Sequence, residues 1–443
     1  EVDLAKKIAK ELGVKVQYTA VTAQTRAALL DNGQTDLMIA TYTINDERKN
    51  NYSISNPYYY DEIGFLVNKS SGINSPKALD GKTIGVAQGS TTKASLEAYA
   101  KDNNIKFHYM QLGSYPELAI ALRAYRIDAF SVDKSILSGY VSKNNKILKQ
   151  GFDTMEYGIA SKKSNSQVTE YVNSLLAKWQ KDGSLQKLYK KYKLTPAKPA
   201  NNWKGAKFMF ILATDTTNPY ALSRWADYFA NFGQFAKGFF YTLGMAVCAL
   251  IVALLLGLIF GAMSSSRNKL AKAIARVYVE IFQNTPLLVH FVFVFYGLSI
   301  LTNGLIKVPA FWTSVLCVGV YTGAYMSEVI RSGIESIPRG QTEAALSQGF
   351  TYRETMSIII LPQAVRIIIP PMINQVVNLI KNTSTVAIIS GADIMFTAKA
   401  WAYDTTNYVP AFAGAALLYF IMCFPVATWG RRKEEANKKT YSL

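Results

Sequence analysis

Residue types suited to covalent chemistry are sparse in this chain of 443 residues. Its two histidines, His108 and His290, are too far apart in sequence to suggest a metal site or a nucleophile with its base. The three cysteines, Cys248, Cys317 and Cys423, lie in apolar runs at wide spacing and suggest neither a disulfide framework nor a metal site. The Gly-x-x-x-x-Gly-Lys-Ser/Thr loop that binds nucleotide phosphates is absent. These patterns argue against an enzyme.

Groups suited to binding lie in the first 200 residues. Arg48, with Thr43 close by in sequence, can hold a carboxylate through its bidentate guanidinium. Thr91, which follows Gly89, can add backbone N–H groups to such a contact. Asp133, at the end of an apolar run, can balance an ammonium group.

Each of these groups also has a plainer interpretation. Arg48 could be solvated within the charged run Asp46–Lys49, and Asp133 could form a surface salt bridge with Lys134. Thr91 could cap a helix that starts at the next residue, a role that is compatible with binding.

The elements that must position these groups alternate between short apolar runs and amphipathic stretches. Such alternation favours an α/β fold with largely parallel sheets. We expect strands at Val14–Tyr18, Asp36–Ala40, Thr83–Ala87 and Ile127–Val132, and helices at 92–104 and 116–126.

Two extended pieces, Ile63–Val67 and Tyr157–Ala160, suit a double-stranded hinge between two lobes. The segment Lys193–Gly205 is rich in proline, asparagine and lysine and suits a linker. Residues 1–12 already form an amphipathic pattern at the very start of the sequence. We therefore expect that an export signal and the first strand of the first lobe are missing from it.

Composition separates the two halves of the chain. The whole sequence is 50% hydrophobic and 18% charged, with a formal net charge of +18. Of the first 200 residues 47 are charged, against only 31 of the last 243, which points to membrane segments in the second half. The basic excess forms no stripe and accompanies no nucleic-acid-binding motif, so we expect no nucleic-acid partner.

Five apolar stretches in the second half are candidates for membrane spans. A stretch of 26 residues reaches about 39 Å as a helix, enough for a hydrocarbon core of about 30 Å. The fourth stretch contains Pro370 and Pro371, where we expect a kink. The five stretches are Gly238–Met263, Ile281–Ile306, Val308–Ser327, Ile367–Ile380 and Thr405–Gly430.

Basic residues concentrate in alternate connections between these stretches. The segments 264–276 and 331–366 and the tail after 430 carry most of them, and the loops 301–309 and 389–409 carry one lysine each. By the positive-inside rule the basic segments are cytoplasmic. Five spans then place the C-terminus inside and residues 1–200 outside.

The basic segment 335–365 contains Glu343, Ala344 and Ala345, then Gly349, then Ile359-x-Leu361-Pro362. This spacing resembles the signature loop of ABC-importer permeases, and Glu280–Leu288, Gly323–Arg331 and Asn378–Ser384 resemble its polar-amino-acid subfamily. We expect a short helix at Glu343–Ser347 that Gly349 ends, and a second helix that Pro362 stops.

The resemblance to these permeases implies three partners. The short helix would dock in a groove on a separate cytoplasmic ATPase, present as a dimer, which would hold ATP and Mg while this chain holds no cofactor. Five spans enclose too little for a pore, so we expect a second permease copy, most simply in a homodimer. The lipid bilayer surrounds both, and a Gram-positive-type bacterium would suit a receptor fused to its permease.

Three segments of the first half are similar to the amino-acid-binding proteins of ABC importers: Thr41–Lys49, Gly85–Thr91 and Arg126–Asp133. The similarity implies an amino acid ligand and a backbone carbonyl near Thr41 as a partner of its ammonium group. The expected contacts are then Thr41, Thr43, Arg48, Gly89, Ser90, Thr91 and Asp133.

Selectivity for the ligand side chain is expected from Arg26. The sequence Gln24-Thr-Arg26, 22 residues before Arg48, is similar to binders of acidic amino acids, in which the equivalent arginine contacts the ligand side chain. A second arginine favours glutamate, aspartate or glutamine and would repel lysine or arginine. The alternative interpretation is an arginine on a helix surface.

Four polar residues in the apolar half would be costly facing lipid, namely Glu328, Asn374, Asn378 and Lys381. They could line a translocation path. Alternatively they make hydrogen bonds between helices, with Gly257 and Gly261 as a close-packing face.

We therefore predict a two-lobed α/β domain of the type II periplasmic-binding-protein kind, followed by an all-α permease of five helices. Its function would be ATP-driven import of a polar amino acid. The alternatives are a ligand-gated ion channel or a membrane receptor built on the same bilobed fold. The expected parts are a binding domain at 1–197, a linker with an elbow helix at 198–234, a permease at 235–432 with its coupling loop at 335–365, and a cytoplasmic tail at 433–443.

Overall fold

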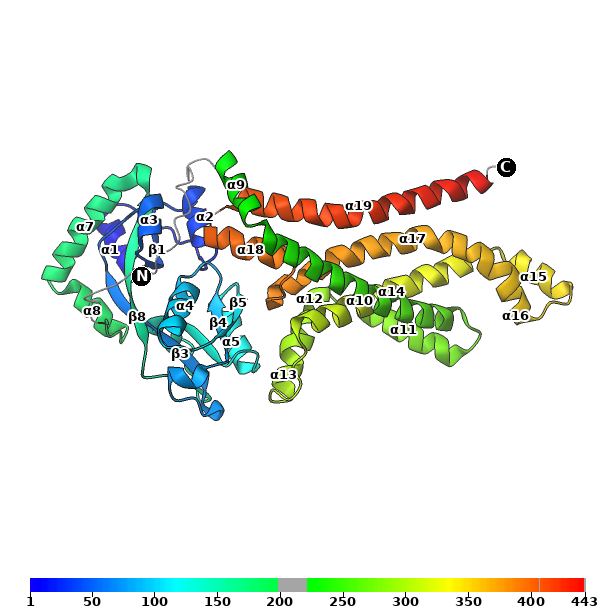
Figure 1. Ribbon diagram of the computed structural model, residues 1–443, viewed down its shortest axis with the longest axis horizontal. Helices are drawn as coiled ribbons and strands as arrows, with labels where there is room; N and C mark the ends of the chain where they lie inside the picture. The colour runs from blue at the N-terminus through cyan, green and yellow to red at the C-terminus, as the bar shows by residue number, and fades with distance from the viewer. Residues whose placement is uncertain (198–220, 406, 442–443) are drawn as a thin grey trace. The chain divides into compact units, whose positions relative to one another are not determined.

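The computed structural model describes residues 1–197, 221–405 and 407–441 (Figure 1). The chain divides into two compact units. The first comprises residues 1–224 with 400–408, and the second comprises 225–399 with 409–443. Most of the linker that the sequence predicts at 198–234 lies outside the described residues, which resume just before helix α9, Leu222–Ala230.

The first unit, here called the receptor domain, is built on one sheet in the order β1-β8-β3-β6-β4-β5, with β2 paired to β8 and β7 to β3. Its strands are β1 Met38–Thr43, β2 Tyr52–Ile54, β3 Tyr59–Asn68, β4 Thr83–Ala87, β5 His108–Leu112, β6 Ala129–Asp133, β7 Asn145–Ile147 and β8 Phe152–Lys162. Its helices are α1 Val2–Leu12, α2 Arg26–Asp31, α3 Asp46–Asn51, α4 Thr92–Asp102, α5 Tyr115–Arg123, α6 Lys134–Ser138, α7 Ser166–Lys181 and α8 Ser184–Lys191.

Two long antiparallel strands, β3 and β8, join two lobes, as the sequence predicts. Tyr59 pairs with Tyr157 at one end of this ladder, and Glu62 pairs with Thr154 further along. The first lobe adds β1 and β2 to β8, and the second adds β6, β4 and β5 beyond β3. Because both crossings are paired strands, the lobes can rotate about them while their own cores stay packed.

Two details of the predicted sheet are wrong. Parallel pairing is confined to the second lobe, where β4 pairs with β5 and with β6, while the other pairs are antiparallel because β3 and β8 run between lobes in opposite directions. The segment Val14–Tyr18 is extended but is not a strand. A strand needs a ladder partner, and within the described residues β1 pairs only with β8.

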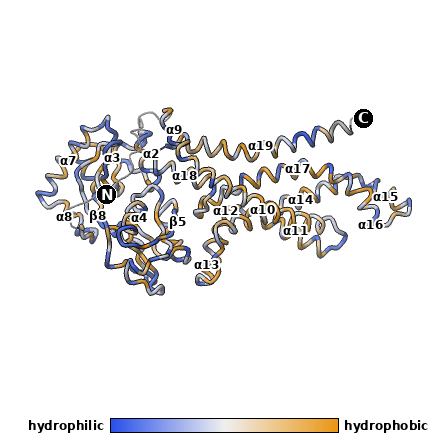
Figure 2. Tube along the Cα trace, in the orientation of Figure 1, coloured by the Kyte–Doolittle hydropathy of each residue, from blue (hydrophilic) through white to orange (hydrophobic). Residues whose placement is uncertain are grey.

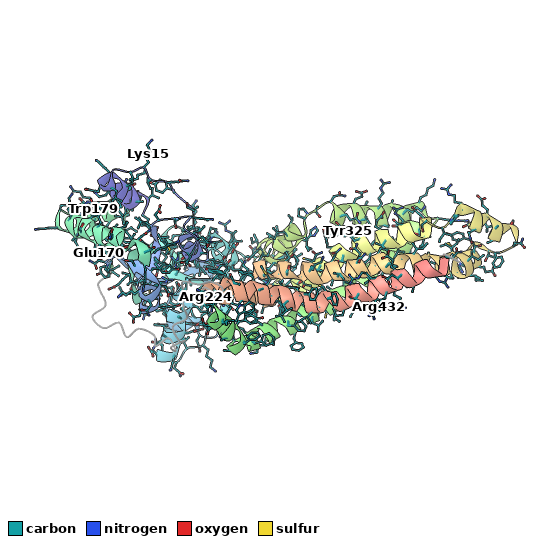
Figure 3. All side chains as sticks on the ribbon, turned by 90° about the horizontal axis from the view of Figure 1, so that it is seen from above. Lys15, Glu170, Trp179, Arg224, Tyr325 and Arg432 are labelled. Carbon is teal, nitrogen blue, oxygen red and sulfur yellow. The ribbon has the colours of Figure 1, made fainter. Side chains whose placement is uncertain are left out.

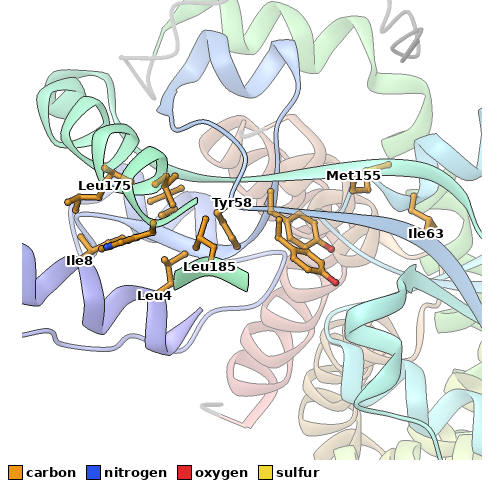
Figure 4. Packing of buried hydrophobic residues seen from close by; sticks show 13 residues of the cluster. Leu4, Ile8, Tyr58, Ile63, Met155, Leu175 and Leu185 are labelled. Carbon is orange, nitrogen blue, oxygen red and sulfur yellow. The ribbon is translucent and has the colours of Figure 1, made fainter. Parts of the chain in front are cut away.

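The core of the first lobe forms between α1, α7, α8 and the crossing strands (Figure 4). Buried residues of α7 recur at helical spacing, which gives the helix one apolar face. Trp179 on that face is 2% exposed, whereas Glu170 is exposed (both labelled in Figure 3). The cluster includes Leu4 and Ile8 of α1 and Leu175 of α7. This packing holds α1 and α7 against the crossing strands β3 and β8.

The second unit, here called the permease domain, is helical. α10 and α14 lie side by side (Figure 1) and approach closely because glycines face bulky side chains. A Cβ at Gly257 would lie 2.7 Å from Cβ of Met326, and one at Gly261 would lie 2.8 Å from Ile330. These contacts confirm the predicted close-packing face. The helices are α10 Phe232–Ser265, α11 Lys269–Gln283, α12 Leu287–Val292, α13 Leu298–Leu301, α14 Ala310–Glu335, α15 Arg339–Ser347, α16 Tyr352–Glu354, α17 Leu361–Asn382, α18 Ile394–Thr405 and α19 Tyr408–Tyr441, with turns η4 Phe293–Gly297, η5 Thr355–Ile360 and η6 Thr383–Ile389.

Three helical stretches among the described residues are long and apolar enough to cross a membrane: Phe232–Ser265, Tyr352–Ile389 and Tyr408–Ala436. A fourth is the pair α11 and α12–α13, if it is counted as one span. Figure 2 shows hydrophobic residues along α10 and hydrophilic ones toward the C-terminal end of α19. α14 is also long but carries charged and small residues, so five crossings remain a prediction.

Two predicted features of these helices need correction. The stretch Ile281–Ile306 is not straight, because α11 and α12 are bent by 95° at a break that ends at Pro286. Pro362 does not stop a helix, because it lies in the first turn of α17 directly after the π-helical turn η5. Wider π turns accommodate a proline that cannot donate its hydrogen bond. Pro370 and Pro371 likewise lie inside α17.

Replacing Leu175 tests the packing of the first lobe. Leu175 is 4% exposed in the cluster of α1, α7 and α8. Leu175→Ala should lower the free energy of unfolding of the receptor domain by about 2–5 kcal/mol because it leaves a cavity. Urea unfolding followed by pulse proteolysis measures the change. Tyr171→Ala, at a 40% exposed position of the same helix, is the control and should cost about 0.5 kcal/mol or less; equal effects would contradict the described packing.

Candidate functional site

The C-terminal end of β1 and the first turn of α3 bring Arg48 into the receptor domain. The Asn45 side chain caps α3 by accepting a hydrogen bond from the backbone N–H of Arg48 at 2.8 Å. The Arg48 guanidinium donates to the Thr43 carbonyl at 2.9 Å and lies 4.0 Å from the ring centre of Tyr42. Arg48 is therefore held by its own strand and helix and is not a solvated residue of the run 46–49.

Arg26 approaches the same tyrosine from the start of α2. Its Nη1 donates to the carbonyls of Ala40 at 2.6 Å and Thr41 at 3.1 Å, and its guanidinium lies 5.1 Å from the Tyr42 ring centre. Arg26 is only 5% exposed, and its Nε has no hydrogen-bond partner among the described residues. The interpretation of Arg26 as a helix-surface arginine is therefore wrong.

The two guanidiniums share one ring and no carboxylate. Neither Arg26 nor Arg48 forms an ion pair within the part of the chain that the structure describes. Burial, with a contribution from nearby Arg26, lowers the pKa of Arg48 to about 10. The Tyr42 ring face attracts both cations and partly offsets their repulsion. An anion bound between them would remove the remaining cost of two buried like charges.

The second lobe contributes the loop between β4 and α4. Gly89 has a φ of +71°, a region that favours glycine, and Ser90 donates its hydroxyl to the Ala87 carbonyl at 2.7 Å. Thr91 occupies the position before α4, but its side chain makes no capping hydrogen bond. The hydroxyl of Thr91 is therefore not used as a cap. The backbone N–H groups at this helix start suit an anion.

Asp133 ends β6 and is 7% exposed. Burial raises its pKa to about 7, against a hydrogen bond from Tyr157 and the charge of Arg26, while Asp61 raises it further. The predicted alternative, a surface salt bridge with Lys134, is wrong, because Lys134 pairs instead with Glu62. A cationic group beside Asp133 would favour its ionised form.

Three residues of the candidate site are not predicted from the sequence. Tyr42 lies within strand β1 and has no motif of its own, although its position in the sequence between Arg26 and Arg48 could have indicated a role. Tyr115 starts α5. Burial raises its pKa to about 12 against the charges of Arg26 and Arg48, while Asp133 adds to the rise, so Tyr115 lies near these groups. Glu1 accepts hydrogen bonds from Thr41 N at 2.5 Å and from the Tyr58 hydroxyl at 2.8 Å, and no motif indicates this role.

Thr41 itself stands in a left-handed conformation, with φ of +47°. This is strained for a β-branched residue and turns its carbonyl out of the ladder geometry of β1. That carbonyl accepts from Arg26, which places it at the edge of the guanidinium cluster. The receptor domain therefore gathers two cations, one buried carboxylate and a helix start around one place, an arrangement that can bind a small zwitterion with a second acidic group.

The coupling loop forms a separate feature at one end of the permease domain. Glu343 and Ala344 are exposed on α15, whereas Ala345 is 4% exposed. Gly349 ends the helix with φ of +86°, as the sequence predicts. An open groove runs beside α15 and is lined by Gly340, Gln341, Ala344, Ala345, Gln348, Phe350 and Ile359.

The four predicted membrane polar residues fall into two groups. Glu328 is half-buried on α14, where its carboxylate accepts from Arg331 Nε at 3.0 and 3.1 Å. Asn374, Asn378 and Lys381 are exposed in the chain and recur at i, i+4 and i+7 along α17, so they lie on one face of that helix. The structure does not bring Glu328 into that face.

Comparison with known families matches both units. Residues 1–195 match the family model described as bacterial extracellular solute-binding proteins, family 3. Residues 253–434 match the model described as the inner membrane component of binding-protein-dependent transport systems.

Individual proteins are similar to one half of the chain each. The probable glutamine ABC transporter permease protein GlnM of Bacillus subtilis (strain 168) is 36% identical over 48% of this chain and 97% of its own length. The glutamate/aspartate import permease protein GltJ of Escherichia coli (strain K12) is 34% identical over 38% of this chain and 76% of its own. A solved ancestral arginine-binding protein bound to arginine is 34% identical over 43% of this chain and 86% of its own, with a TM-score of 0.40.

Removing the Asp133 carboxyl should change how stability depends on pH. Burial raises the pKa of Asp133 in the folded state to about 7, above the ordinary value of 3.8 for an aspartate. The native state then holds an extra proton between these values, so stability is fully present below pH 3.8 and is lost as pH rises through about 7, at up to about 1.4 kcal/mol per pH unit. Asp133→Asn should flatten this fall in urea unfolding between pH 4.5 and 8.

Asp102→Asn, at an exposed position at the end of α4, is the matched control and should leave the pH profile unchanged. An unchanged or steeper fall in the Asp133→Asn variant would contradict the burial of this carboxyl.

Proposed function

This chain belongs to the amino-acid ABC importers, as a family-3 solute-binding domain fused to a permease domain, and we propose that it captures glutamate, or a close relative such as glutamine or aspartate, and delivers it to its own permease. The supporting observation is a pair of guanidiniums, buried Arg26 and half-buried Arg48, that share Tyr42 and form no ion pair in the described part of the chain.

The three charges of glutamate find three counterparts in this proposal. Its α-carboxylate binds Arg48 and the backbone N–H groups at Gly89–Thr91, where a bidentate fork and a helix start both favour an anion. Its ammonium group binds Asp133 and the carbonyl of Thr41. Its side-chain carboxylate binds Arg26, whose Nε has no hydrogen-bond partner among the described residues. Thr43 holds Arg48 through its carbonyl, and Ser90 holds the loop before α4 through its hydroxyl.

Selectivity follows from the same charges. Glutamine offers Arg26 a carbonyl oxygen in place of a carboxylate and keeps a weaker contact. Lysine or arginine would place a cation against buried Arg26, which forms no ion pair among the described residues, and the repulsion between the two cations would weaken binding. The printed names of similar permeases include glutamine, glutamate/aspartate and arginine, so they support a polar amino acid, and the choice among these rests on the charges of the site.

Binding residues come from both lobes, so a ligand that contacts all of them stabilises the closed arrangement about β3 and β8. The ligand can favour closure only by as much as it binds the closed form more tightly than the open form. We propose that this closed form is what the permease receives.

Power for transport is proposed to come from a partner. This chain has no P-loop, so ATP and Mg would be bound by a separate cytoplasmic ATPase dimer. The exposed face of α15, with Glu343 and Ala344, and the groove beside it support docking of that subunit at this end. The backbone carbonyl of buried Ala345 accepts a hydrogen bond from Phe350 N at 3.1 Å, which closes the C-terminal turn of α15.

Orientation is supported by a contact between two basic segments. The Arg267 guanidinium, between α10 and α11, lies 4.0 Å from the ring centre of Tyr352 at the start of α16. The two segments therefore lie at one end of the permease domain, and by the positive-inside rule that end is cytoplasmic. The receptor domain is then extracellular, in the cell membrane of a Gram-positive-type bacterium.

A second permease copy is supported by the polar face of α17. Asn374, Asn378 and Lys381 are exposed along the C-terminal half of a largely apolar helix, and lipid contact would be costly for them. A homodimer would place two such faces around a shared path for the amino acid. Glu328 is proposed to support that path through its pair with Arg331 rather than by lining it.

Replacing Arg26 tests the assignment of the ligand. Arg26→Gln should weaken glutamate binding to the full chain in nanodiscs by about 10- to 100-fold, because one charge-assisted contact is lost. Glutamine binding should change by less than about fivefold, because an amide can still accept from Gln. Arg48→Gln should weaken both amino acids alike. Isothermal calorimetry with L-glutamate and L-glutamine measures these ratios.

Arg123→Gln, at an exposed position on α5, is the matched control and should bind as the unchanged chain does. A uniform loss for both ligands in Arg26→Gln, or binding of arginine as tight as that of glutamate, would refute the proposed ligand class.

Enlarging the exposed face of α15 tests the docking of the ATPase. Ala344→Arg places a long side chain on the outer face without filling the buried side at Ala345. It should lower glutamate-stimulated ATP hydrolysis by the assembled complex more than tenfold, an effect of about 1.4 kcal/mol or more, while glutamate binding stays unchanged. Lys272→Glu, at an exposed position of the other basic segment, is the comparison, and an equal loss there would argue against α15 as the docking element.

A further inference from the structure

Two buried amide side chains from different lobes meet across the receptor domain. Gln24, just before α2 in the first lobe, donates its Nε2 to Oε1 of Gln88, just after β4 in the second lobe. Gln24 is 8% exposed and Gln88 is 3% exposed. Gln24 and Gln88 lie in two separate segments, Gln24–Arg26 and Gly85–Thr91, and neither segment predicts a role for these amides.

The second lobe forms a slot for this contact. A Cβ at Gly113, after β5, would lie 3.1 Å from Nε2 of Gln24, and a Cβ at Gly89 would lie 2.8 Å from the Ala23 carbonyl. Glycines at both positions let the backbones of the two lobes approach without a side chain between them. Parallel strands β4 and β5 end at the same edge of the sheet, which is why Gln88, Gly89 and Gly113 lie together.

The contact exists only while the lobes are together. When they separate, both amides return to water and lose nothing, whereas a closed form that lacked one amide would leave the other buried without a partner. The pair therefore adds stability to the closed form alone, and removing either partner costs the closed form more than the open form.

The position of the pair links two parts of the proposed binding site. Gln24 precedes Arg26 by two residues, and Gln88 directly precedes Gly89, so the hydrogen bond holds the start of α2 against the loop that leads into α4. The arginine proposed to contact the ligand side chain and the N–H groups proposed to contact its carboxylate are thereby held at a fixed distance.

We propose that Gln24 and Gln88 are positioning residues that latch the two lobes in the closed form, and so set how long an amino acid stays bound without contacting it themselves. The latch rests on the proposed amino-acid-binding function. It acts on the dissociation rate, because the amides meet only after closure, and it leaves the association rate nearly unchanged.

A double-mutant cycle in the full chain tests the latch. Gln24→Ala and Gln88→Ala should each speed L-glutamate dissociation about tenfold, the size expected for one buried neutral hydrogen bond. The double variant should speed L-glutamate dissociation by no more than about twentyfold, because the first substitution already removes the hydrogen bond between the two amides. Stopped-flow fluorescence in nanodiscs gives both rates. Gln167→Ala, exposed on α7, is the matched control and should leave them unchanged.

A second variant closes the slot without removing an amide. Gly113→Ala places a methyl group against the Gln24 side chain and should also speed dissociation. Thermal unfolding of the receptor domain should stay the same in all these variants. Additive effects of Gln24→Ala and Gln88→Ala, unchanged dissociation, or an effect confined to the association rate would overturn the latch.

A distance measurement separates failure of the latch from failure of the proposed function. Spin labels at the exposed residues Lys49 and Lys101, in a chain with its native cysteines replaced, report the distance between the lobes by double electron–electron resonance. The Gln24→Ala variant should populate longer distances than the parent chain. If neither glutamate nor glutamine binds but this shift appears, the proposed ligand is wrong and the latch stands; without the shift, the latch is wrong.

Discussion

Two guanidiniums packed on one tyrosine ring, neither of them ion-paired with a carboxylate in the described part of the chain, are the constraint on which the receptor domain depends. Placing Arg26 and Arg48 near Tyr42 costs free energy, because both are desolvated and their charges repel. The fold offsets part of this cost with backbone carbonyls at the end of β1 and with the ring face itself. The remainder is available to a ligand that brings negative charge, so an unfavourable arrangement in the protein becomes binding free energy.

The surrounding architecture makes that binding consequential. The paired strands β3 and β8 let two lobes move as units, and the counter-charges of the site are divided between them, with the arginines on one lobe and Asp133 on the other. A ligand that contacts both sets of groups would therefore favour closure of the lobes. Fusion of a binding domain to a permease domain in one chain raises the effective concentration of each domain for the other.

Much of this could be predicted from the sequence, because motifs with fixed spacing identify local chemistry. The arginine of α3, the glycine turn before α4 and the loop around α15 were found in this way. Prediction failed where the outcome depends on distant residues. The segment 14–18 has a strand pattern but no ladder partner. The chain bends by 95° between α11 and α12 within a stretch that the sequence presents as continuously uncharged. Pro362 lies in the first turn of α17, directly after the π-helical turn η5. Tyr42, Tyr115 and the Gln24–Gln88 contact depend on which strands end at the same edge, and a local pattern does not record this.

Transport of labelled glutamate into lipid vesicles is the most direct test of the central claim. The full chain is reconstituted with its ATPase subunit, with ATP supplied only on the side that carries α15. The account predicts that glutamate accumulates on that side only when ATP is hydrolysed, and that adding glutamate without ATP produces no ion current. A glutamate-evoked current without ATP, or no ATP-dependent accumulation of any acidic or amidated amino acid, would contradict it.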